Sequence, residues 1–343
     1  MTESIPPQDP ESSLRSQWKA LVARYHRPSH GRSIWQLANT IVPYALGLGL
    51  MYWSLNISYL LTLVLAVPTA GLLVRIFIIS HDCGHGAYFR SRRANDIVGG
   101  ITSFLCLTPY HYWKHEHAVH HACAGNLDER GRGDIWTMTV KEYAAASRIK
   151  RLAYRLYRNP IILFGIGAFS VFMFEYRVPP KNGTARDRRS VWRTNAGLAA
   201  VLVLAHFTIG LKALALIHMP VLLLAAGAGA WLFYVQHQFE DVYWARDNEW
   251  DYVAACMQGS SYYRLPRVLQ WFTGNIGFHH IHHLSAKIPN YFLEKCHKEN
   301  PIMQRVHQLS LWSSLRCMRF RLWDEEKRQL ITFAQYRRYD RAA

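Results

Sequence analysis

The sequence predicts an all-α integral membrane protein, with four transmembrane helices in two hairpins and a cytosolic helical cap. Half of the 343 residues are hydrophobic, yet the mean hydropathy is only −0.08. The apolar residues are therefore concentrated in runs, and four of these runs approach the roughly 20 residues that an α-helix needs to cross a bilayer. Short turns join the runs in pairs, and much of the remaining chain is polar and basic.

The first hairpin is predicted from residues 36–54 and 57–80, and the second from residues 196–211 and 213–235. Prolines inside these segments are compatible with membrane helices, because neighbouring helices satisfy the freed backbone groups. The first arm of the second hairpin is short and contains His206, so its ends are the least defined.

Two shorter apolar stretches, residues 97–109 and 161–176, are predicted to be amphipathic or re-entrant. The first is too short to span a bilayer. The glycines and flanking arginines of the second are typical of a helix that lies in the membrane interface.

The distribution of the +17 net charge predicts the orientation. The turn around Asn56 has no Lys or Arg, the later turn has only Lys212, and residues 76–195 and 240–343 are rich in both. Because positively charged segments stay on the cytoplasmic side, both termini and the long polar segments are expected there. The expected parts are a cytosolic N-terminal extension (1–35), a membrane domain (36–300) and a basic cytosolic C-terminal tail (301–343).

Motifs that are missing exclude several classes of protein. The basic charge comes without zinc-finger spacing, an aromatic RNA-binding signature or a basic heptad helix, so nucleic acid is not an expected partner. The six cysteines include no C-x-x-C pair and are expected to be reduced thiols, not a disulfide framework. The polar N-terminus lacks the apolar core of a signal peptide.

Most of the 18 histidines lie in three clusters that come after the apolar segments. The clusters are at 81–85, 115–121 and 279–283, and His237 stands alone near the end of the fourth apolar segment. Residues three and four apart share a helix face, so each cluster aims two or three imidazoles at one point if it is helical. The histidines with this spacing are His81 and His85; His117, His120 and His121; and His279, His282 and His283.

These eight side chains exceed the four ligands of a tetrahedral zinc site, and His237 makes nine, enough for two metals with open positions. Imidazole suits Zn, Cu, Fe and Ni, so the ligand type alone does not name the metal. The two hairpins return all clusters to one side, and a helix over residues 57–85, about 43 Å long, would carry the first cluster beyond a hydrocarbon core of about 30 Å. By contrast, His206 and His218 are isolated and are interpreted as packed side chains.

The chain resembles the membrane fatty acid desaturases, in the acyl-lipid branch with three histidine boxes. The segments that carry the resemblance are HDCGHG at 81–86, HAVHH at 117–121 and GNIGFHHIHH at 274–283. Residues 284–291 are also similar to the segment after the third box in that family, and the resemblance extends over about residues 61–291.

The resemblance implies two irons, dioxygen and the removal of two vicinal hydrogens from a fatty acyl chain, with a membrane glycerolipid favoured as its carrier. Carried over box by box, the implied ligands are the eight spaced histidines, and His237 matches an additional ligand position in related enzymes. His111 and His280 fall outside the pattern, as does His115, which replaces His117 if the helix register differs. The residues placed to support ligands are Asp82, Glu116, Glu240 and Asp241 as acceptors from imidazole, and Asn275 as a bridge through water.

An external electron donor is also expected. Reducing dioxygen to water while two hydrogens are removed takes two more electrons, and the chain has no flavin motif, haem motif or iron–sulfur cysteine spacing. A ferredoxin-like protein is the expected donor, and an anionic lipid surface is the alternative partner for the same basic residues. Those residues are Arg90, Arg92 and Arg93, and Arg186, Arg188 and Arg189.

Two alternatives stay open. An acyl or alkyl hydroxylase, or a carotenoid-modifying oxygenase, would use the same clusters with oxygen rebound in place of the second hydrogen removal. A metal-binding membrane transporter is a different class, but it would place histidines along the spanning helices. No side chain deprotonates an unactivated methylene, so each of the oxidations needs a redox metal, which excludes zinc.

Overall fold

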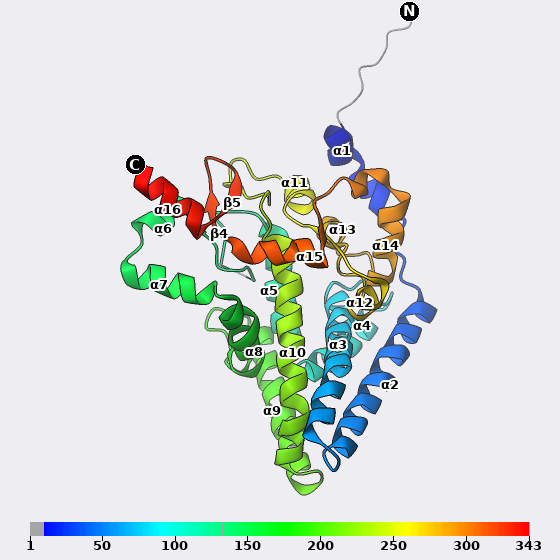
Figure 1. The fold of residues 1–343 in the computed structure, drawn as a ribbon. Coiled ribbons are helices and arrows are strands. Elements are labelled where there is room, and N and C mark those ends of the chain that lie inside the picture. Colours follow the sequence, from blue (N-terminus) through cyan, green and yellow to red (C-terminus); the bar gives the residue numbers. More distant parts are fainter. Residues whose placement is uncertain (1–9, 132, 343) are drawn as a thin grey trace, which may run out of the picture.

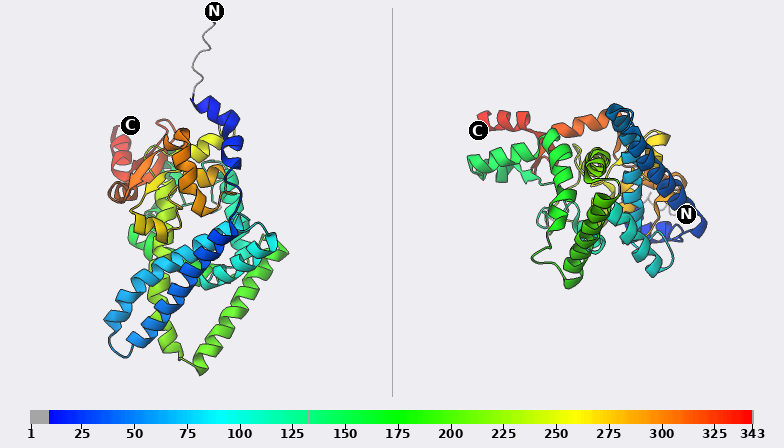
Figure 2. Two further views of the ribbon diagram at one scale, coloured as in Figure 1. Left: turned by 90° about the vertical axis from the view of Figure 1, so that its right-hand side faces the viewer. Right: turned by 90° about the horizontal axis from the view of Figure 1, so that it is seen from below.

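The computed structural model describes residues 10–131 and 133–342 of the chain. The polar start of the expected N-terminal extension, residues 1–9, lies outside the described residues. The described chain is mostly helical, and its long helices form a wedge below a cap of shorter helices and strands (Figure 1). The first and last described helices lie on the side of the cap, α1 (Pro10–Ala23) beside α14 (Asn290–Glu299) and α16 (Phe333–Ala342) at the opposite margin (Figures 1 and 2).

Three helices are long and apolar enough to cross a membrane: α2 (His30–Ser54), α3 (Tyr59–Gly84) and α10 (Leu211–His237). A fourth span is available if α7 (Arg148–Tyr157) and the segment Ile162–Arg177, which meet at a bend of 71°, count as one. The first predicted hairpin and the last apolar segment are therefore helical as expected. Apolar side chains on their outer faces are exposed, as lipid contact requires.

The short arm of the second predicted hairpin, residues 196–211, lies mostly within α9 (Ala185–Phe207). The first half of α9 contains four arginines, and only its second half is continuously apolar. The described helices that meet the length and hydropathy of a span do not include it. It joins α10 through a turn at the narrow end of the wedge (Figure 1).

The two shorter apolar stretches form short helical pieces. Residues 97–105 belong to α4 (Arg92–Leu105), whose N-cap Ser91 accepts a hydrogen bond from the backbone of Ala94. The second stretch is a π-helical segment, Ile162–Gly167, followed by α8 (Ala168–Met173) and a 3₁₀ turn at Glu175–Arg177. The remaining α-helices are α5 (Tyr110–Cys123), α6 (Val140–Ala145), α11 (Tyr252–Met257), α12 (Arg267–Phe272), α13 (His279–Leu284) and α15 (Leu311–Ser314), and 3₁₀ turns cover Pro301–Gln304 and Leu315–Arg319.

Residues 301–342, expected as a basic tail, fold back onto the cap. Strand β4 (Phe320–Asp324) pairs in parallel with β1 (Met138–Thr139) and antiparallel with β5 (Gln329–Thr332). Strand β3 (Gln308–Ser310) pairs in parallel with β2 (Tyr262–Arg264). The end of the chain thus closes over segments that come much earlier in the sequence, as the pairing of Leu322 with Met138 shows.

The buried Arg158 joins this C-terminal segment to the membrane helices. Its guanidinium donates to the side chain of Gln238 at 2.8 Å, to the hydroxyl of Tyr234 at 3.1 Å and to the carbonyl of Phe320 at 2.9 Å. A second nitrogen donates to the carbonyl of Trp136 at 3.1 Å. One side chain therefore fixes the end of α10, the start of β4 and the loop before β1.

We expect Arg158→Met to destabilise the protein by about 3 kcal/mol or more, because several buried oxygens lose a charged hydrogen-bond donor. The measurement is the free energy of unfolding of purified protein in detergent. Lys150→Met is the control, since this exposed side chain on α7 makes no contact of that kind within the described chain. Equal stability of the two variants would show that Arg158 does not hold the segments together.

Candidate metal centre

The three histidine clusters lie on helices, as their spacing requires. Helix α3 runs without a break from Tyr59 to Gly84 and is capped by His85, so His81 and His85 are one turn apart. At 1.5 Å per residue its 26 residues measure about 39 Å, longer than a hydrocarbon core of about 30 Å. The second cluster occupies the last turns of α5, and the third forms the fully buried α13.

Steric constraints explain why both positions 84 and 86 of the first box are glycine. Gly84 lies where a Cβ would be 3.1 Å from the ring of Trp113, so its absence lets α5 approach α3. Gly86 has a φ of +69°, a backbone conformation that glycine adopts at little cost. The turn after His85 can therefore leave the helix at once, and Trp113 can stack on His117 with ring centroids 4.6 Å apart.

Five of the predicted histidines form one group. One nitrogen from each lies within 4.8 Å of the others: His81, His85, His117, His121 and His282. The Nε2 atom of His121 is 3.1 Å from Nε2 of His117 and 3.0 Å from Nε2 of His282. The group draws on α3, α5 and α13, so residues from all three boxes meet at one point.

A second group contains the other predicted histidines. Nitrogens of His120, His237 and His283 lie within 4.8 Å of one another. Nε2 of His279 lies 2.9 Å from Nε2 of His237 and 3.1 Å from Nε2 of His283. The isolated His237, at the end of α10, is thus brought to the boxes, and all nine predicted histidines belong to one of two adjacent groups.

The side chains of both groups are suited to binding a metal ion. The Nε2 atoms of His85 and His120 are buried and have no hydrogen-bond partner among the described residues. Burial, and then the neighbouring imidazoles, lower the pKa well below its usual value in several members of the groups, so these rings are neutral at pH 7. Neutral imidazoles with converging lone pairs are what a metal requires. The histidines outside the spans with such a shift are His117, His121, His279, His282 and His283.

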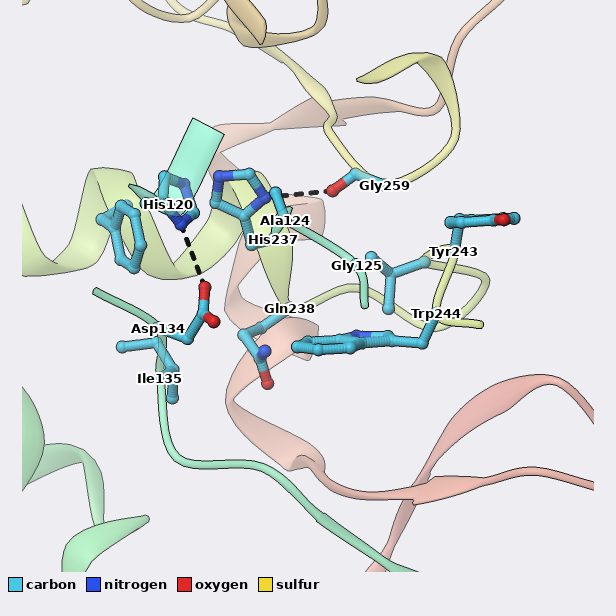
Figure 3. Close-up of a pocket in the computed structure, with 12 residues that line it drawn as sticks. His120, Ala124, Gly125, Asp134, Ile135, His237, Gln238, Tyr243, Trp244 and Gly259 are labelled. Atoms are coloured by element: carbon cyan, nitrogen blue, oxygen red, sulfur yellow. Dashed lines mark hydrogen bonds and ion pairs between the residues drawn. The ribbon is translucent and has the colours of Figure 1, made fainter. Parts of the chain in front are cut away.

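Carboxylate and carbonyl oxygens contact the Nδ1 atoms of several of these rings. Nδ1 of His81 lies 3.1 Å from the carboxylate of Asp82, and Nδ1 of His237 lies 3.0 Å from the carbonyl of Gly259. Nδ1 of His120 lies 3.0 Å from the carboxylate of Asp134 (Figure 3). Each contact fixes the ring orientation and directs Nε2 towards the group.

Asp134 also faces a small cavity of about 10 Å³ next to the second group, which His120, His237 and Trp244 help to line (Figure 3). Its second oxygen and the indole nitrogen of Trp244 are buried and have no partner within the described chain. The cavity is therefore polar on the side that adjoins the histidines.

The other predicted supporting residues do not contact the two groups. Glu240 and Asp241 are exposed, and Glu116 makes no hydrogen bond to a histidine within the described chain. The Asn275 amide bonds to Gln270 and to the backbone of Asn290. Asp134 is not predictable from the sequence as a supporting residue, because it lies in a loop after α5 and no regular spacing relates it to a histidine box.

The histidines outside the boxes have partners of their own. Nδ1 of His115 lies 3.0 Å from the carboxylate of Asp187, and the α5 register places His117, not His115, in the first group. His280 lies 2.9 Å from the carbonyl of Met303, and His218 lies 3.2 Å from the carbonyl of Leu214.

Comparisons with known proteins agree with this arrangement. The sequence profile of the family described as "Fatty acid desaturase" matches residues 57–314. The chain is 47% identical to a "Fatty acid desaturase" of Bacillus subtilis over 312 residues, covering 91% of this chain and 89% of the relative. It is 27% identical to an "sn-1 oleoyl-lipid 12-desaturase" of Anabaena variabilis, over 83% of this chain and 81% of the relative.

A third relative is the "sn-2 acyl-lipid omega-3 desaturase (ferredoxin), chloroplastic" of Arabidopsis thaliana, 27% identical over 68% of this chain and 54% of the relative. The family profile covers most of the chain and contains every histidine of the two groups. A membrane protein with two neighbouring histidine groups and this sequence similarity is an oxidoreductase of lipid metabolism: the chain belongs to the fatty acid desaturase family.

Proposed function

We propose that the two histidine groups hold two iron ions and that the enzyme desaturates glycerolipid-linked acyl chains with dioxygen and an external electron donor. The observation that carries the proposal is the gathering of nine histidines from four helices into two adjacent groups. The "acyl-lipid" and "oleoyl-lipid" names of the relatives support a lipid-linked substrate.

The imidazole nitrogens of the two groups are chemically suited to iron. Two irons bound there would supply the redox chemistry that breaks an unactivated C–H bond with dioxygen, which zinc cannot supply. The protein's own part is to hold neutral imidazoles in place, with Asp82 and Asp134 orienting two of them. Burial of the groups keeps bulk water away from the reacting carbon. Hydroxylated chains in place of unsaturated ones would favour the hydroxylase alternative.

The proposed topology has four spans, with both termini and both histidine groups in the cytoplasm. Two features support it: the turns at Asn56 and Lys212 carry little charge, and the segments between hairpins are rich in arginine. The short apolar half of α9 would have to complete the third span, with its arginines in the cytoplasmic headgroup layer.

Reporter fusions should therefore give the outer side at Asn56 and Lys212, and the inner side at Asn182 and at the C-terminus. Each hairpin crosses the bilayer twice, so the segment after it must return to its starting side. Activity of paired cytoplasmic and external reporters measures the side. An external signal at Asn182 would contradict a shared cytoplasmic site.

Replacing any of the nine histidines by Ala is expected to abolish new double bonds in the lipids of an expressing host and to lower the bound iron from about two per chain. The measurements are fatty acid analysis of the host and metal analysis of the purified variants. The nine are His81, His85, His117, His120, His121, His237, His279, His282 and His283.

Histidines outside the two groups serve as controls. His115→Ala, which removes the partner of Asp187, should keep iron, as should His206→Ala and His218→Ala. Asp134→Asn should weaken iron binding about 10- to 100-fold, because His120 loses the carboxylate that orients it. Active wild-type protein with one zinc and no iron would refute the di-iron proposal.

For the electron donor we propose a soluble acidic protein such as a ferredoxin, which docks on Arg90, Arg92 and Arg93. These three side chains are exposed, and they come within eight residues after His85 of the first box. The "ferredoxin" in the name of the Arabidopsis relative supports a donor of this kind. Complementary charge steers association, and salt screens it with a Debye length of about 8 Å at 0.15 M.

Changing Arg90, Arg92 and Arg93 together to Gln should lower the apparent affinity for an acidic ferredoxin, and salt should lower it in the wild type. Steady-state turnover at varied donor concentration measures this, while turnover at saturating donor and iron content should stay constant. Lys141, Arg337 and Arg338, changed together to Gln, remove equal charge from the opposite margin of the cap. An affinity insensitive to salt and to the first variant would exclude this docking site.

A further inference from the structure

A basic pocket lies between α5 and α9, outside the two histidine groups. It is open to solvent and has a volume of about 430 Å³. Its lining is His111 from α5 together with Ala185, Arg186, Arg189, Ser190 and Arg193 from α9. The hydroxyl of Ser190 accepts a hydrogen bond from the backbone N–H of His111 at 3.1 Å, which joins the two helices at the base of the pocket.

The positive charge of this pocket is only partly compensated. Arg186, Arg189 and Arg193 share one face of α9, because they are three and seven residues apart. Arg186 lies 3.9 Å from the carboxylate of Asp96, which also binds Lys114 at 3.3 Å. Arg189 and Arg193 have no ion-pair partner within the described residues. The pocket therefore favours an anion.

The position of the pocket along α9 indicates which anion is available. Beyond Arg193 the helix becomes apolar, and Val201, Leu204 and Phe207 are exposed on it. The exposed Trp192 lies at this boundary, as aromatic side chains do at the headgroup level of membranes. Arginines at that depth meet lipid phosphates.

We propose that this pocket binds the phosphate of a membrane glycerophospholipid, and that the bound lipid is the substrate. The second part rests on the proposed function. Helix α5 carries His111 in the pocket and His117 in the first histidine group, six residues and about 9 Å further along. On this proposal, an acyl chain esterified to the glycerol of a lipid held here extends from the pocket towards the histidine groups.

The test compares Arg189→Gln and Arg193→Gln with Arg188→Gln, a matched loss of charge on the same helix outside the pocket. Turnover is measured in nanodiscs with phosphatidylglycerol and with a glycolipid that has the same acyl chains and no phosphate. Losing one charged hydrogen bond should raise the apparent KM for phosphatidylglycerol about tenfold. The kcat, the iron content and the KM for the glycolipid should not change.

A binding measurement separates the two parts of the proposal. Native mass spectrometry of the purified protein should show retained phosphatidylglycerol in the wild type and in Arg188→Gln, and less in the pocket variants. Equilibrium dialysis with inorganic phosphate, in phosphate-free lipid, distinguishes a free-phosphate site: tight binding there that the pocket variants lose would overturn the lipid proposal.

The remaining outcomes are also decisive. Equal lipid retention in all variants would overturn the phosphate site. Lost retention with an unchanged KM for phosphatidylglycerol would overturn the substrate role. If the wild type retains lipid through the arginines but desaturates none of the lipids offered, the proposed function fails while the phosphate site stands.

Discussion

The constraint on which the structure depends is the convergence of nine imidazoles, six of them buried and three half-buried, from four helices. Nitrogen pairs such as those of His237 and His279, 2.9 Å apart, face each other without a carbonyl or carboxylate between them. Neutral rings at this spacing share at most one proton per pair, and the remaining lone pairs are turned towards one another. Such an arrangement requires that each helix that carries a ring is held firmly.

Hydrogen bonds around the histidines keep these helices in place. Asp82, next to a histidine of the first box, accepts two hydrogen bonds from Asn290, the backbone N–H at 2.6 Å and the side chain at 2.8 Å. Gln36 of α2 binds the same asparagine side chain at 2.9 Å. The first membrane helix, the first box and the segment after the third box are thereby joined through one buried amide. This gives a physical reason for the likeness of residues 284–291 to the family.

The parts of this architecture that obey local rules were predictable from the sequence. Hydrophobic length indicated α2, α3 and α10, and spacing by three and four placed the histidines on shared helix faces. The features that depend on distant residues were not predictable. Asp134 approaches His120 only because a loop turns back, and β1 meets β4 although the two strands are far apart in the sequence. The ends of the short arm at residues 196–211 were also not predictable, because α9 is one continuous helix whose hydropathy changes midway.

The contacts of the C-terminal strands with the cap have a consequence for the order of events during synthesis. The backbone N–H of Leu330 in β5 donates to the carbonyl of Glu240, three residues after His237. During synthesis the histidines emerge in the order of the boxes, but this contact forms only after residue 330 has left the ribosome. At about 5–20 residues per second, many seconds separate the first histidines from closure. The nascent chain therefore passes through a stage in which these histidines have been synthesised but the C-terminal segment has not yet closed over the cap.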